Sequence, residues 1–317
     1  MSHSCVTSED LHNSTHLFAK PAGITTFQTP RLMNISPESS PNSSMRRYAI
    51  RLIPIAIAAL VVFFQFVSSE KFTNEAGRSA HLGLTTEQEQ VLGLQSYQQV
   101  LSESEAVRSG PEYDLVTSVA ARLARATGKN FDWQVSVVRS PQVNAFCLPG
   151  GKIVVYTGIL PIAKNAAGLA TVMGHEMAHA TLRHGSERMF KQKATQTLLT
   201  GVQFSIGDMD YEQRRMVMGA IGAGAQYGIL LPFGRDHESE ADKVGLSYMA
   251  RAGYDPNEAV AFWGRMGEAG GQQPPEFMST HPSHGTRIER LKEMLPAAIE
   301  EYRRAIGGRA ASPQLER

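Results

Sequence analysis

The chain has 317 residues, of which 42% are hydrophobic and 19% are charged, and this length is ample for one or two domains with a packed core. The formal net charge of +1 gives no reason to expect nucleic acid as a partner. Only Cys5 and Cys147 are present, which excludes a disulfide framework. With no second cysteine near it, we expect Cys147 to be a packed side chain, not a nucleophile or ligand.

The N-terminal part of the chain has two segments. Residues 1–44 are rich in Ser, Thr, Asn and Pro, and they are predicted to be disordered or untranslated, so that translation starts at Met1 or at Met45. Residues 45–69 begin with a basic Met-Arg-Arg sequence and continue with an apolar run. This pattern predicts either a single membrane anchor or a cleaved signal peptide, with a buried soluble helix as a third alternative. The basic residues place the N-terminus in the cytoplasm and the rest of the chain outside it.

The next region predicts two helices followed by a small sheet. A first helix opens at Thr85, and a second covers about 113–127, where apolar residues recur at helical spacing. Three short apolar runs, at 133–138, 144–148 and 152–156, are typical of strands. Together with the helical patterns downstream, they predict an α+β protein, mostly helical, with a sheet of three to four strands.

A buried helix after this sheet carries the pattern H-E-x-x-H. Asn165 is placed to cap it, and His175 and His179 lie about 40° apart on one face, one turn from each other. Two imidazoles so placed can share one zinc ion, and Glu176 lies beside them to accept a proton from water. Scattered surface histidines are the alternative, but the apolar neighbours in this segment favour a buried helix.

Two further helical segments follow. Residues 189–199 are predicted to continue as helix. Residues 216–231 are rich in Gly and Ala, which favours a core or membrane-abutting helix over a spanning one, and Pro232 is expected to end this helix.

A catalytic zinc needs a third protein ligand. His184 lies about 180° around the helix from His175, so it would ligate the same ion only if the helix broke, and we expect it at the surface or behind a ligand. Glu238 is the better candidate, and it shares a helix face with Asp242, which is placed to accept a hydrogen bond from a ligand histidine.

The C-terminal segment leads through Ser279-Thr-His281-Pro282 into an amphipathic helix that we expect to end at Gly307-Gly308. His281 and Arg287 flank the start of this helix. Because peptide hydrolysis develops a negative charge on the carbonyl oxygen, His281 or Arg287 is a candidate donor to that oxyanion.

H-E-x-x-H followed far downstream by E-x-E-A-D-x-x-G resembles the zinc metallopeptidases numbered as family forty-eight, which include the CAAX prenyl proteases and the HtpX-like proteases. Three more stretches fit this family: Asn144-Ala-Phe-Cys-Leu-Pro-Gly-Gly151, Leu231-Pro-Phe-Gly-Arg235 and Ser279-Thr-His281-Pro282-Ser-His284. The resemblance covers roughly residues 80–305, and one hydrophobic run before a soluble core is most similar to the periplasmic and mitochondrial inner-membrane branch with overlapping protease activity.

The resemblance implies a gluzincin core over residues 80–307, followed by a flexible tail at 308–317. One zinc ion per subunit is then bound by His175, His179 and Glu238, with Glu176 as the catalytic base. An extended peptide is expected to add to the strand Asn144-Ala145-Phe146-Cys147-Leu148. An autoinhibited relative adds the possibility that His281 occupies the open zinc position and gates the enzyme.

The function expected from this resemblance is zinc-dependent endopeptidase activity in quality control of misfolded envelope or membrane proteins. The expected location is the bacterial inner membrane facing the periplasm, or the periplasm itself if the signal is cleaved. The alternative function is a non-proteolytic envelope chaperone or assembly factor with a structural metal site.

Overall fold

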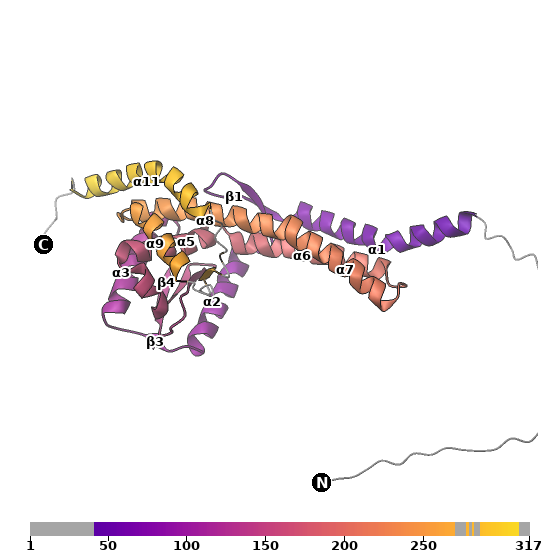
Figure 1. Cartoon of the computed structure of the whole chain (residues 1–317), viewed down its shortest axis with the longest axis horizontal. Helices are drawn as coiled ribbons and strands as arrows, with labels where there is room; N and C mark the ends of the chain where they lie inside the picture. The colour runs from indigo at the N-terminus through magenta and orange to yellow at the C-terminus, as the bar shows by residue number, and fades with distance from the viewer. Residues whose placement is uncertain (1–40, 270–276, 279–280, 282–285, 311–317) are drawn as a thin grey trace, which may run out of the picture. The chain divides into compact units, whose positions relative to one another are not determined.

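The computed structural model describes residues 41–269, 277–278, 281 and 286–310, and the predictions for residues 1–40 and 311–317 lie outside them. The chain divides into two compact units, 1–45 and 46–317. The larger unit carries every feature discussed below (Figure 1).

A long apolar helix, α1 (Pro41–Ser68), opens the described chain. Its segment Ala49–Ser68 is the one stretch within the described residues that is long and apolar enough to cross a membrane, although a signal sequence would pass the same test. The helix leads directly into an antiparallel hairpin of β1 (Glu70–Thr73) and β2 (Ser79–Leu82). The sequence patterns did not predict this hairpin, because its strands are short and largely polar.

The main sheet has four strands in the order β3-β4-β6-β5, within the predicted three to four. They are β3 (Ala106–Val107), β4 (Gln134–Val138), β5 (Ala145–Leu148) and β6 (Lys152–Tyr156), where β4 and β6 run parallel and the other pairs antiparallel. Strand β5 ends the sheet, and its second edge pairs with no other strand in the described part of the chain.

Helices cover both faces of this sheet. Ile153 and Val155 of β6 join the main core formed with α3 (Pro111–Thr127) and α5 (Ala166–Thr181). Val154 points the other way, toward Tyr97 of α2 (Thr86–Ser102), because successive side chains of a strand alternate between faces. The short helices η1 (Thr157–Ile159) and α4 (Leu160–Ala163) connect β6 to α5.

The second half of the chain is helical. It consists of α6 (His184–Ser205), α7 (Tyr211–Ala225), the π-turn η2 (Gln226–Leu230), α8 (Leu231–Arg251), α9 (Asn257–Glu268) and α11 (Arg287–Ala310). The expectation that Pro232 ends a helix is wrong. Helical backbone continues from α7 through η2 into α8, and Pro232 lies directly after the π-turn, an irregularity of the kind that accommodates a proline without ending the helix.

The C-terminal helix also extends further than expected. α11 continues through Gly307 and Gly308 to Ala310. The expected end at the two glycines rested on the preference of glycine for positions just after a helix, which is a tendency and not a requirement.

Candidate metal centre

Helix α5 holds His175, Glu176 and His179 in the middle of the fold. The side chain of Asn165 caps the helix as predicted, by accepting a hydrogen bond from the Gly168 N–H at 2.8 Å. His175 and Glu176 are 2% and 3% exposed. Their ring and carboxylate are therefore oriented by packing, as a reactive site requires.

Helix α8 crosses α5 at very short range and brings Glu238 to the two histidines. A Cβ atom placed on Gly245 of α8 would lie 2.7 Å from the His175 backbone nitrogen, so only glycine permits this approach. Glu238 Oε2 lies 3.3 Å from His175 Nε2, and Glu238 Oε1 lies 3.4 Å from His179 Nε2. The structure thus brings together two histidines and a glutamate from distant parts of the sequence.

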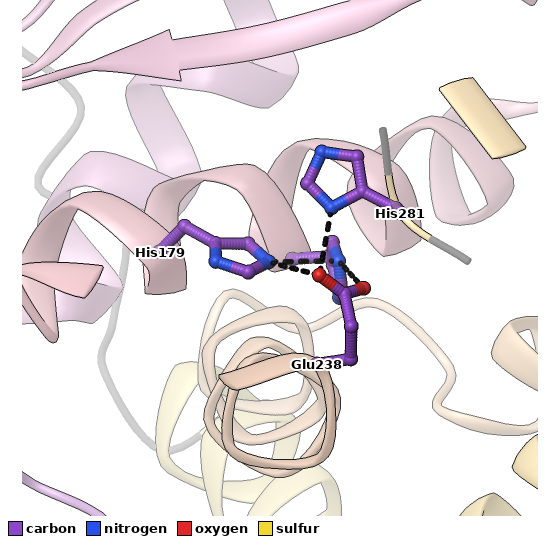
Figure 2. A group of neighbouring side chains, drawn as sticks. His179, Glu238 and His281 are labelled. Atoms are coloured by element: carbon purple, nitrogen blue, oxygen red, sulfur yellow. Dashed lines mark hydrogen bonds and ion pairs between the residues drawn. The ribbon is translucent and has the colours of Figure 1, made fainter. Parts of the chain in front are cut away.

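His281 completes the cluster (Figure 2). Its Nδ1 lies 3.1 Å from Glu238 Oε1, and its Nε2 lies 3.5 Å from Glu176 Oε1. One ligand atom each from His175, His179, Glu238 and His281 falls within 4.8 Å of the others. The neighbouring residues of the Ser279–His284 motif lie outside the described residues, so only His281 of that motif is placed.

The electrostatics of the cluster suit a cation. Burial lowers the pKa of His179 well below its ordinary value, which leaves a neutral imidazole free to act as a ligand. Burial would raise the pKa of Glu238, but hydrogen bonds with the three histidines hold it well below its usual range, so this carboxylate is ionised. Glu238 Oε2 and Glu176 Oε1 are buried without a hydrogen-bond partner among the described residues. A divalent cation bound by this N,N,O set satisfies such oxygens.

Glu176 differs from Glu238 in its environment. Burial raises the pKa of the Glu176 carboxyl, despite the histidines nearby. A carboxylate whose pKa is raised toward neutrality is suited to taking up a proton and giving it back.

Behind His175, Asp242 and Arg287 form a buried pair. Asp242 Oδ1 lies 3.0 Å from His175 Nδ1, and Arg287 Nη2 donates to the same oxygen at 2.5 Å. The Arg287 guanidinium lies over the Trp263 ring at 3.3 Å from its centroid. Asp242 thus contacts the second ring nitrogen of the candidate ligand His175, a position from which a carboxylate can orient such a ring.

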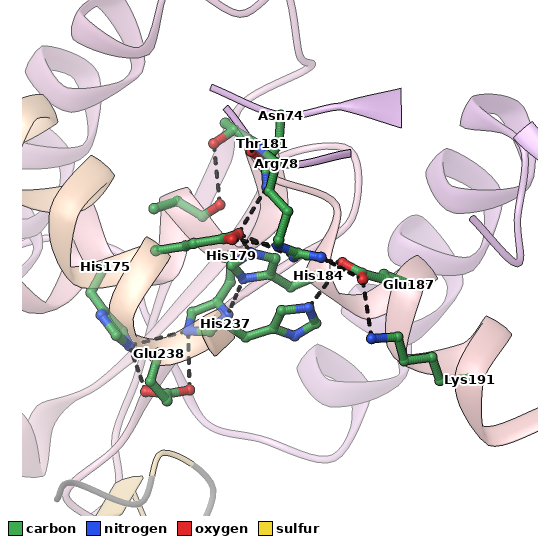
Figure 3. Close-up of polar contacts among 12 residues, drawn as sticks. Asn74, Arg78, His175, His179, Thr181, His184, Glu187, Lys191, His237 and Glu238 are labelled. Atoms are coloured by element: carbon green, nitrogen blue, oxygen red, sulfur yellow. Dashed lines mark hydrogen bonds and ion pairs between the residues drawn. The ribbon is translucent and has the colours of Figure 1, made fainter. Parts of the chain in front are cut away.

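A second layer of polar side chains surrounds His179 (Figure 3). His184 is 3% exposed, so the surface alternative for this residue is wrong. Its Nδ1 lies 3.0 Å from His179 Nδ1, and its Nε2 lies 3.0 Å from Glu240 Oε2. This arrangement leaves His179 Nε2 directed at the cluster, with the ring held by the chain His179–His184–Glu240.

Helix α5 does break before His184. Arg183 adopts a left-handed conformation with φ 57°, which is strained for a non-glycine residue. Its guanidinium compensates by donating to Glu89, Glu70 and the Leu84 carbonyl at 2.7, 2.9 and 3.0 Å. The break lets α6 start in a new direction and turns His184 back toward His179.

The same layer reaches the hairpin that follows α1. Arg78 donates to both oxygens of Glu187 at 2.6 and 2.7 Å, and it also donates to Glu240. His237 Nε2 lies 3.0 Å from Glu187 Oε2, and its ring stacks on His184 at 3.9 Å. We refer to Arg78, His184, Glu187, His237 and Glu240 as the polar network.

The sequence patterns did not reveal this network. A weak signal was available, since His184 and Glu187 are three residues apart, as are His237 and Glu240, so each pair shares one face of its helix. Arg78 gave no signal, because its partners are more than a hundred residues away.

A cleft of about 390 Å³ opens onto the cluster and is lined by Glu176, His179, Glu238, His281 and Cys147, among other residues. Cys147 brings strand β5 to the wall of this cleft, and burial raises the pKa of its thiol well above the ordinary value, so it is a neutral packed group. Arg287 is not one of the described residues that line the cleft. The segment that carries His281 is attached nearby, because the Phe277 N–H donates to the Val143 carbonyl at 3.4 Å.

Comparison with known proteins agrees with this geometry. The sequence profile described as Peptidase family M48 matches residues 110–295. The chain is 37% identical to the mitochondrial metalloendopeptidase OMA1 of Schizosaccharomyces pombe over 66% of this chain and 62% of that protein. It is 38% identical to the OMA1 of Arabidopsis thaliana over 60% of this chain and 37% of that protein. It is 32% identical to the human protein of the same name over 76% of this chain and 48% of that protein.

These relatives correct one prediction. The expected location in a bacterial inner membrane facing the periplasm is wrong, since the relatives named above are mitochondrial proteins. The error arose because a basic segment followed by an apolar run occurs both in bacterial signal sequences and in mitochondrial membrane proteins, so this pattern does not distinguish the two locations.

Proposed function

Because this chain belongs to peptidase family M48, we propose that it is a zinc-dependent endopeptidase attached to a membrane by α1. The observation that carries the proposal is the cluster of His175, His179, Glu238 and His281 with the buried Glu176 beside it. One zinc ion per subunit is held by His175, His179 and Glu238. By analogy with the relatives, we place the protein in mitochondria, with misfolded or surplus membrane proteins as substrates.

Each side chain has a role in this proposal. Zinc bound at the cluster supplies a Lewis acid that acidifies water and polarises the scissile carbonyl. Glu176 accepts the proton of the attacking water and passes it to the leaving amine. Asp242 and the pair His184–Glu240 fix the rings of His175 and His179, so that Nε2 of each ring is directed at the ion.

The edge strand β5 is the proposed substrate site, through Asn144, Ala145, Phe146, Cys147 and Leu148. An extended peptide that pairs with this edge forms backbone hydrogen bonds and passes through the cleft beside Glu176. This mode recognises the backbone, which suits a protease with varied protein substrates.

For His281, the contacts support a gating role over an oxyanion role. Its Nδ1 contacts the ligand Glu238, and its Nε2 lies beside Glu176, where the attacking water must be held. An oxyanion donor would need a free N–H directed at the substrate carbonyl. We propose that the His281 side chain occupies the site at rest and is displaced for turnover. Arg287, which faces Asp242 and Trp263, orients the site and is not the oxyanion donor.

The test compares purified wild type with Glu176→Gln, measuring casein hydrolysis and bound zinc in both. We expect hydrolysis to fall by a factor of about 10² to 10⁴ while the zinc content is unchanged, because Glu176 is not a ligand. Glu103→Gln, at the exposed end of α2, is the matched control and keeps full activity. A zinc-loaded Glu176→Gln protein with wild-type activity, or a wild type indifferent to chelator, would refute the proposal and favour the chaperone alternative.

A further inference from the structure

Helix α1 packs against α6, which runs antiparallel along it (Figure 1). At the C-terminal end of α1, Phe66 packs on His81 and His81 on Phe190 of α6, with ring centroids 3.9 and 5.7 Å apart. At the N-terminal end, Arg51 forms an ion pair with Asp208, in the turn after α6. The contact therefore extends from residue 51 to residue 66 of α1, which is about 22 Å of helix.

The two helices approach closely in the middle of the apolar segment. A Cβ atom on Gly201 of α6 would lie 2.5 Å from the Ala58 Cβ and 3.0 Å from the Pro54 carbonyl oxygen. Small residues at such a crossing are typical of helices that pack within a membrane. If Ala49–Ser68 crosses a bilayer, Gly201 is at the depth of its centre.

The charged residues of the chain are arranged in register with this contact. No Asp, Glu, Lys or Arg occurs in residues 52–69, in 194–207 or in 216–234. Arg51, Asp208 and the charged residues of 210–215 flank these stretches on one side, and Lys191, Lys193 and Arg235 flank them on the other. Lys193 lines a hollow with Ile57, Ala58 and Val61 of α1. The uncharged stretch of α6, residues 194–207, is about 21 Å of helix. This is shorter than the hydrocarbon core of about 30 Å, so it suits a segment that enters the bilayer without crossing it.

The hydroxyl and large apolar side chains within the band also fit lipid. The hydroxyls of Thr197, Thr200 and Ser205 donate to the carbonyls four residues earlier, at 2.9, 2.8 and 2.9 Å, so their donors are satisfied inside the helix. Large apolar side chains on this hairpin face outward: Leu198, Phe204, Met216 and Ile221 are 40%, 72%, 65% and 38% exposed. In water these side chains would form an unfavourable apolar surface.

We propose that α6 and α7 form a helical hairpin that inserts into the lipid bilayer beside α1. Because Glu238 follows Gly234 by four residues, the metal centre then lies within about 6 Å of the hydrocarbon edge along α8. If the proposed protease function holds, the site faces chain segments that emerge from the bilayer surface.

The test uses the full-length protein in phosphatidylcholine vesicles, with Cys5 and Cys147 replaced by Ser and Ala. Single cysteines at Leu198 and Ile221 carry an environment-sensitive fluorophore, which is exposed to iodide in water or to bromine atoms on the acyl chains. Ile57→Cys on α1 is the matched lipid control, and Val91→Cys on α2 is the matched water control. Both of these residues are 56% exposed apolar side chains. Circular dichroism verifies the fold of each labelled protein, and Met216→Cys replaces a variant that misfolds.

We expect acyl-chain bromine to quench Leu198→Cys and Ile221→Cys like Ile57→Cys, and at least about twofold more than Val91→Cys, because the hydrocarbon core excludes iodide. Quenching by iodide at the level of Val91→Cys would refute the inference. Shielding from both quenchers would also refute it, since it would indicate a protein partner on this face. The assay measures quenching and not proteolysis, so it tests this inference independently of the proposed function.

Discussion

Replacing Arg78 by Met removes the cation that lies between Glu187 and Glu240. Burial would raise the pKa of Glu187, but His237 and Arg78 lower it from 4.5 to about 2. The interval between these values corresponds to about 3.4 kcal/mol of stability at neutral pH. His237 supplies part of this energy, and the Arg78 side chain is 30% exposed, so that water screens the pair. Arg78→Met also removes the ion pair between Arg78 and Glu240. With both pairs lost, we expect the free energy of unfolding to fall by about 2–3 kcal/mol.

The assay is urea unfolding of the detergent-solubilised protein, followed by circular dichroism at several pH values. A carboxyl with a depressed pKa contributes stability above its unfolded pKa, and this contribution is lost as the pH falls through the folded pKa. The difference between wild type and Arg78→Met should therefore be complete above pH 4.5 and shrink toward pH 2.

The matched control is Arg139→Met. Arg139 pairs with Glu105 at 2.8 Å, but the two side chains are 57% and 71% exposed, and such surface pairs contribute less than about 1 kcal/mol. The reasoning is refuted if Arg78→Met costs no more than Arg139→Met, or if its cost is as large at pH 3 as at pH 7. An Arg78→Met/Glu187→Gln protein should be more stable than the sum of the two single losses predicts, because the two groups interact directly.

Three further changes probe the metal centre. Asp242→Asn should weaken zinc binding about 10- to 100-fold, measured by competition with a chelating dye, because the amide no longer fixes the His175 ring as the carboxylate does. His281→Ala should raise basal casein hydrolysis if the side chain occupies the site at rest, and a strong loss of activity would support the oxyanion role. Gly245→Ala should lower the unfolding midpoint and the zinc content, because its Cβ meets the His175 nitrogen at 2.7 Å. Gly264→Ala, which meets nothing within 4 Å, should leave both unchanged.

The parts of the site set by local periodicity were predictable from the sequence. His175, Glu176 and His179 follow from one helical turn, and Glu238 with Asp242 follows from one face of a later helix, α8, and the need for a third ligand. The core strands were also predictable from the sequence, since residues 152–156 form a strand with the predicted bounds. Each of these inferences uses a local pattern, and only the need for a third ligand joined Glu238 to the two histidines.

The parts set by unusual backbone or by distant charge pairs were not predictable. Arg183 breaks α5 in a left-handed conformation that sequence patterns assign to Gly or Asn, so the sequence left open whether His184 lies at the surface or behind a ligand. The Arg78–Glu240 pair joins residues 162 positions apart, and no local pattern reports such a contact. Pro232 was taken as a helix end, but the helix continues past it directly after the π-turn η2, an irregularity that no local sequence pattern reports.

The same helices that build the metal centre also reach α1. Helix α6 holds His184 beside His179 at its first residue and packs on α1 at Gly201. The hairpin that follows α1 places Arg78 on Glu187 of the same helix. A displacement of α6 along α1 therefore acts on a helix whose first residue, His184, contacts His179. The ring of His179 is thus positioned by contacts that begin beside α1, and the polar network lies between the two.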